Sequence, residues 1–116
     1  MKYIKYFIKI KELTETHWND LELNKKVYGF QIQKGTTWKK GLSKDQIREF
    51  ENSVGFQLPE ILRDYYTVMN GVNKKQINIY GSLGCEPLYS QNIYSFPDDI
   101  QAIKDVREWI YKANKM

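Results

Sequence analysis

Residues 43–71, SKDQIREFENSVGFQLPEILRDYYTVMNG, decide the fold because they predict two short helices joined by a tight connection. Ser43 and Gln46 are spaced as a capping box, in which each side chain binds the other residue's backbone N–H. Gly55 is placed to end this first helix in the left-handed conformation. Between these signals, the apolar residues recur on one helical face: Ile47, Phe50 and Val54.

The second helix is expected to begin at Pro59, since proline is favoured in a first helical turn. Glu60 adds a negative charge near the positive end of the helix dipole, and Asn70-Gly71 is expected to end the helix. Its apolar stripe consists of Leu62, Tyr65, Tyr66 and Met69. Because so few residues join the two helices, they should pack as a helical hairpin.

The N-terminal third has weaker patterns. Residues 3–11 alternate apolar side chains with lysines, which favours a strand, although the same residues also fit one helical face. We expect a strand there, followed by a short helix with Thr14 as its N-cap. Residues 28–34 again alternate and predict an extended segment, and Gly35 and Gly41 should bracket a loop that holds Trp38.

Beyond Gly71, short strands and a last helix are expected. Residues 76–80 alternate as in a strand, an irregular strand follows around Leu88 to Phe96, and a helix runs from about 97 to 115. The apolar face of this helix is Ile100, Ile103, Val106, Trp109 and Ile110. The pattern as a whole predicts one α+β domain over residues 1–116, with a shared core that comprises Ile47, Phe50, Leu62, Tyr65 and Trp109.

Composition narrows the class of function. The net charge of +4 arises mainly in residues 1–40, which hold nine lysines and four acidic residues. The chain has 15 Lys and three Arg, whereas readers of nucleic acid usually rely on arginine, so nucleic-acid binding is not favoured. The single cysteine, Cys85, fits a reducing compartment. No stretch approaches the length of a membrane span, and we expect a cytoplasmic protein.

The residues that carry catalytic and metal chemistry are scarce. His17 and Cys85 are too few for a zinc site, and their spacing does not indicate a nucleophilic pair. Asp98 and Asp99 are adjacent, which suits the start of a helix better than a metal. We therefore expect no catalytic, metal or cofactor site.

The ordered series of motifs resembles the SUKH superfamily, specifically its Smi/Knr-type domains. The matching pieces are Gly35, Trp38, Gly41-Leu42-Ser43, Ile47, Phe50, Glu51, Leu58-Pro59 and Asn70-Gly71, and then IYGSLGCEP (79–87) and YSFPDDIQAIKDVREWI (94–110). The resemblance, over about residues 28–112, implies helices packed on one side of a bent, mostly antiparallel sheet. It also implies a non-enzymatic protein binder. Many bacterial members look like immunity proteins that neutralise toxins by direct contact, and the alternative is a housekeeping regulator or scaffold of the Smi/Knr type.

Two expectations concern partners. A toxin is expected to bind an aromatic and acidic patch made of Tyr80, Glu86, Tyr89, Tyr94, Asp98 and Asp99, because interfaces are rich in tyrosine and loops often carry recognition. The competing interpretation is that Tyr80 and Phe96 are core and that Tyr94 covers them. Family domains usually continue past the WI-containing helix, so the early end at Met116 predicts an open sheet edge and, through it, a homodimer.

Overall fold

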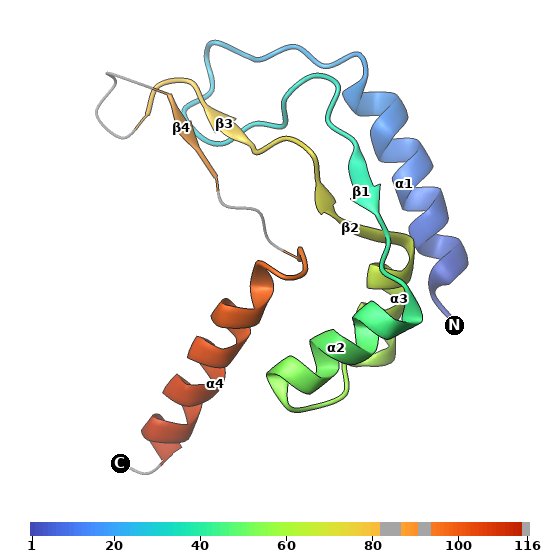
Figure 1. Ribbon diagram of the computed structural model, residues 1–116. Coiled ribbons are helices and arrows are strands. Elements are labelled where there is room, and N and C mark those ends of the chain that lie inside the picture. The colour runs from blue at the N-terminus through green and yellow to red at the C-terminus, as the bar shows by residue number, and fades with distance from the viewer. Residues whose placement is uncertain (82–86, 91–93, 115–116) are drawn as a thin grey trace.

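The computed structural model describes residues 1–81, 87–90 and 94–114. Its described elements are α1 (Ile4–Trp18), β1 (Trp38–Lys40), α2 (Lys44–Val54), α3 (Glu60–Val68), β2 (Met69–Val72), β3 (Ile77–Asn78), β4 (Leu88–Tyr89) and α4 (Asp99–Asn114). The strands form two antiparallel pairs, β1–β2 and β3–β4 (Figure 1). The predicted α+β class with antiparallel pairing is thereby confirmed.

The α2–α3 hairpin forms as the sequence predicts, but α3 ends at Val68, so Met69, Asn70 and Gly71 belong to strand β2 and the prediction that Asn70-Gly71 ends the helix is wrong. Both hydrogen bonds of the Ser43–Gln46 capping box are present, and Gly55 ends α2 with φ 83°. Phe50 is completely buried and packs its ring against Tyr66 at 5.0 Å and Phe96 at 5.1 Å between ring centroids. The buried cluster around it is completed by Leu42, Ile47, Val54, Leu58, Tyr65 and Met69. The core therefore lies between the two helices and the strand that follows them.

The residues around Trp38 form strand β1, whereas the sequence suggested a loop. Trp38 pairs with Val72 and Lys40 with Met69, with an irregularity between the two pairs. The strand then passes close to α3, where a Cβ on Gly41 would lie 2.1 Å from the carbonyl oxygen of Thr67. Glycine is required at this crossing because any side chain would collide with backbone.

The prediction of a strand at residues 3–11 is wrong, because α1 runs unbroken from Ile4 to Trp18. Thr14 lies inside this helix and is not an N-cap: its hydroxyl donates to the Ile10 carbonyl at 2.7 Å. Helical spacing brings Phe7 against Tyr65, with ring centroids 5.7 Å apart, and Trp18 against Trp38 at 5.5 Å. Packing against α3 and β1 decides between two patterns that the local sequence satisfies equally.

The strand predicted at residues 76–80 is shorter in the structure. β3 consists of Ile77 and Asn78, which pair with Tyr89 and Leu88 of β4. On its other side, Ile77 exchanges two backbone hydrogen bonds of 2.9 Å with Gln31. The extended segment predicted at 28–34 thus joins the β3–β4 ribbon at one bridge.

Helix α4 projects from the rest of the fold (Figure 1). The Cα radius of gyration is 16.8 Å and the extents are 43 × 41 × 18 Å, whereas a compact domain of this length has a radius of about 13 Å. The prediction that Trp109 belongs to the core is therefore wrong, since 71% of its surface is exposed. The helix forms as its pattern indicates, but only part of its apolar face meets α2 and α3.

Candidate protein-binding surfaces

The first candidate surface consists of aromatic and apolar side chains on the β3–β4 ribbon and the segment beside it, all of them exposed except the half-buried Tyr80. We call it the ribbon cluster, and its members are Tyr28, Phe30, Tyr80, Leu88 and Tyr89. Tyr28 and Tyr80 stack with ring centroids 4.4 Å apart, and the Tyr80 hydroxyl donates to the carbonyl of Lys25. Tyr28 is 81% exposed and Tyr89 is 57% exposed. Large aromatic side chains that remain this exposed are typical of protein interfaces.

Lysines border the ribbon cluster. Lys25 and Lys26 lie where the chain approaches Tyr80, and Lys74 and Lys75 occupy the turn just before β3. The Lys74 ammonium donates to the Lys34 carbonyl at 2.9 Å, which brings a fifth lysine to the same turn. The described surroundings of the cluster are therefore rich in lysine.

The predicted patch residues fall in two places. Tyr80 and Tyr89 belong to the ribbon cluster, whereas Tyr94, Asp98 and Asp99 lie at the start of α4. Glu86 is outside the described residues. Sequence reasoning missed Tyr28 and Phe30, because only the long-range Gln31–Ile77 bridge brings their segment to the ribbon.

Asp99 holds α4 on the core. One of its carboxylate oxygens accepts from the Tyr66 hydroxyl at 3.1 Å and from the Ser95 amide at 2.6 Å. Burial raises the pKa of the Asp99 carboxyl above its usual value. These bonds give Asp99 a structural role, while Asp98 beside it is exposed.

Tyr94 and its neighbours are fixed by a similar set of bonds. The Tyr65 hydroxyl donates to the Tyr94 carbonyl at 2.8 Å and accepts from the Gly71 amide at 3.0 Å. Burial raises the pKa of Tyr65 to about 12. The side chain of Asn70 makes two hydrogen bonds with the backbone of Phe96, at 2.9 and 2.6 Å. The connection into α4 is thus fastened to α3 and β2.

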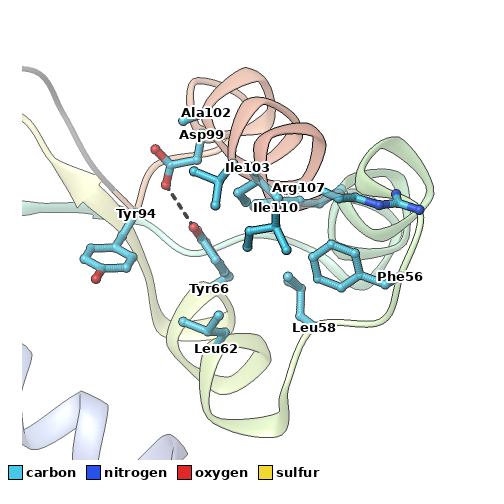
Figure 2. A pocket seen from close by; sticks show the side chains of 12 residues that line it. Phe56, Leu58, Leu62, Tyr66, Tyr94, Asp99, Ala102, Ile103, Arg107 and Ile110 are labelled. Carbon is cyan, nitrogen blue, oxygen red and sulfur yellow. Dashed lines mark hydrogen bonds between the residues drawn. The ribbon is translucent and has the colours of Figure 1, made fainter. Parts of the chain in front are cut away.

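The second candidate surface is an apolar groove between α4 and the α2–α3 hairpin, with a volume of about 660 Å³. Phe56, Leu58 and Leu62 line one side and Ile103 and Ile110 the other (Figure 2). Val106 of α4 lines the groove as well. Two charged residues line it as well, and both are engaged. Asp99 binds Tyr66, and the Arg107 guanidinium donates to the Val54 carbonyl at 2.8 Å, where it caps the end of α2. An occupant of the groove would therefore meet mainly apolar side chains.

Metal ligands do not gather within the part of the chain that the structure describes: no group of three or more His, Cys, Asp or Glu side chains is close enough to hold an ion. His17 is exposed at the end of α1, and Cys85 lies outside the described residues. Among the same residues, no helix has the length and hydropathy to span a membrane.

Comparison with known proteins gives one match. The model of the SMI1 / KNR4 family (SUKH-1) matches residues 41–115, which include the α2–α3 hairpin, strands β2, β3 and β4, and α4. No curated protein and no solved structure matches.

Proposed function

The chain belongs to the SMI1 / KNR4 family (SUKH-1), and from this premise we propose that it is a non-enzymatic protein-binding domain that neutralises a cognate bacterial toxin by direct contact. The ribbon cluster is the contact surface in this proposal. Neutralising a toxin by binding requires an exposed patch held by the fold, and it requires no catalytic residue.

The observation that carries the proposal is the exposure of the tyrosines on the ribbon. Tyr28 and Tyr89 are 81% and 57% exposed, so most of the surface of each side chain is available to a partner. Each ring offers a large apolar area with few rotatable bonds and a hydroxyl that donates or accepts, which is why tyrosine is enriched among residues that dominate binding energy.

The charge around the cluster indicates the chemistry of the partner. Lys25, Lys26, Lys74 and Lys75 border the aromatic residues, so an acidic rim around an apolar centre on the toxin would be complementary. Opposite charges at the rim of an interface mainly accelerate association. We therefore expect the association rate to fall as salt concentration rises.

The test is protection of cells that express a candidate toxin domain encoded by a neighbouring gene, where the gene of a cognate toxin is expected. The variant carries Tyr28→Ala and Tyr89→Ala together, both at exposed positions that leave the core intact. The matched control is Tyr6→Ala on α1, because Tyr6 has the same 57% exposure as Tyr89. We expect the wild type and the control to protect and the double variant to fail.

Full protection by the double variant would place the contact surface elsewhere. If the wild type protected against no neighbouring toxin, the immunity function would be contradicted, and a regulator or scaffold of the Smi/Knr type would take its place.

A further inference from the structure

Helix α4 carries a row of exposed side chains with the spacing of a helix–helix seam. Ala102, Val106, Trp109 and Ala113 follow one another at intervals of four, three and four positions, which is the spacing of the core positions of a coiled coil. All four are exposed, Val106 at 57% and Trp109 at 71%. We call these four residues the α4 seam. The small alanines at both ends allow a second helix to approach closely.

The residues that flank the seam are charged on one side and apolar on the other. Asp105 and Lys112 lie seven positions apart on one flank, and Ile103 and Ile110 lie seven positions apart on the other. In an antiparallel helix pair, like flanks face each other. Asp105 would then meet Lys112 of a second copy, and Ile103 would meet the second copy's Ile110. In a parallel pair the two flanks cross, and Asp105 would face an isoleucine.

We propose that the α4 seam is a homodimer surface on which two copies of the chain pair their α4 helices antiparallel. A single register of the two helices gives every residue of the α4 seam a contact on the second copy. Val106 packs on the second copy's Trp109, Ala102 on the second copy's Ala113, and the two-fold axis repeats each contact. Two intermolecular Asp105–Lys112 ion pairs form on the charged flank.

Charge favours a second copy as the occupant of this face. Although the chain has a net charge of +4, α4 itself carries three acidic and three basic side chains and is neutral. The lysine-rich helix α1 lies on the other side of the fold (Figure 1), so two copies paired through α4 keep their basic parts apart. In the free chain, Asp105 accepts from Gln101 at 2.8 Å and Lys112 pairs with Glu108 at 3.0 Å. Both are exposed contacts within one helix, and such contacts are weak enough to be exchanged.

The dimer would also cover the mouth of the apolar groove. Val106 and Ile110 belong to the α4 wall of the groove, and the register brings the second copy's Trp109 and Ile110 to this wall.

A helix of 16 residues is about 24 Å long. It offers less than the roughly 800 Å² per partner of a standard interface, and we expect a dissociation constant of roughly 10 to 100 µM.

Sedimentation equilibrium of the full chain between low and high micromolar concentration tests the proposal. Trp109→Ala should weaken dimerisation at least about 30-fold, because a central aromatic is lost on both sides. Asp105→Lys or Lys112→Asp alone should weaken it about 5- to 30-fold, since each sets like charges opposite one another twice. The control is Lys104→Glu, a charge change on the opposite face of α4, which should leave the dissociation constant unchanged. Circular dichroism establishes that each variant remains folded.

Combining the two charge changes tests the Asp105–Lys112 pairing more directly than either change alone. The D105K/K112D double variant should dimerise as the wild type does, and a mixture of D105K with K112D should form a heterodimer. A wild type that stays at 13.9 kDa at several hundred micromolar would overturn the proposal, as would charge variants that do not differ from the control. If the chain stayed monomeric and Trp109→Ala abolished protection against the toxin, the seam would belong to the partner protein instead.

Discussion

Replacing Phe50 by alanine removes the side chain that joins α2, α3 and the segment that leads into α4. Its ring is fully buried and contacts the rings of Tyr66 and Phe96. Truncating a buried phenylalanine costs about 3 to 5 kcal/mol, from the lost transfer free energy and the cavity left behind. Because Phe50 also lines the apolar groove, neighbouring side chains can relax toward the gap. We therefore expect a loss of about 3 to 4 kcal/mol in the free energy of unfolding.

The assay is chemical denaturation of the full chain in urea, with the loss read from the shift in midpoint at an unchanged slope. The matched control is Phe56→Ala, since Phe56 lines the same groove but is 44% exposed. That control should cost about 1 kcal/mol, because much of its ring is already in water. A loss below about 1 kcal/mol for Phe50→Ala would show that the core does not lie between α2, α3 and the start of α4.

Two further predictions concern the same hairpin. Ser43→Ala should lower the free energy of unfolding by about 1 kcal/mol in urea denaturation, because the Gln46 amide loses its acceptor. An unchanged midpoint would show that the Ser43 side chain does not stabilise α2. In the folded chain Tyr65 has a pKa of about 12, whereas an unfolded tyrosine has a pKa near 10. The stability that neutral Tyr65 contributes should therefore be complete below pH 10 and be lost as the pH rises toward 12. Equilibrium unfolding in this interval should show a smaller pH dependence for Tyr65→Phe than for the wild type, and an equal dependence would refute the assignment.

The α2–α3 hairpin could be predicted because its signals are local. A capping box, a left-handed glycine and a proline just before a helix each act within a few residues of their own position, so no distant contact is needed to interpret them. The same holds for the register of the apolar face that buries Ile47 and Phe50.

Features that depend on distant contacts could not be predicted in the same way. The alternation in residues 3–11 fits a strand and a helix, and the choice depends on the contacts of Phe7 with Tyr65 and of Trp18 with Trp38. Helix α4 has the apolar face that its pattern indicates, but a pattern does not say whether the chain itself covers that face. Trp109 is exposed for this reason.

The ribbon cluster, too, could be predicted only in part from the sequence. Composition alone directed attention to Tyr80 and Tyr89, which do lie on one ribbon. Tyr28 and Phe30 join them through a bridge between residues 46 positions apart, Gln31 and Ile77, and no local signal marks such a bridge. Two acidic residues of the predicted patch, Asp98 and Asp99, lie instead at the start of α4, where Asp99 is held by Tyr66 and Ser95.

The central claim is that this protein acts by binding a toxin through the ribbon cluster. Isothermal titration calorimetry of the purified chain with a candidate toxin domain encoded by a neighbouring gene measures this directly. We expect tight one-to-one binding per chain that weakens by at least about 30-fold in the variant with Tyr28→Ala and Tyr89→Ala and stays unchanged in Tyr6→Ala. Absence of binding by the wild type, or equal affinity of the wild type and the double variant, would contradict the claim.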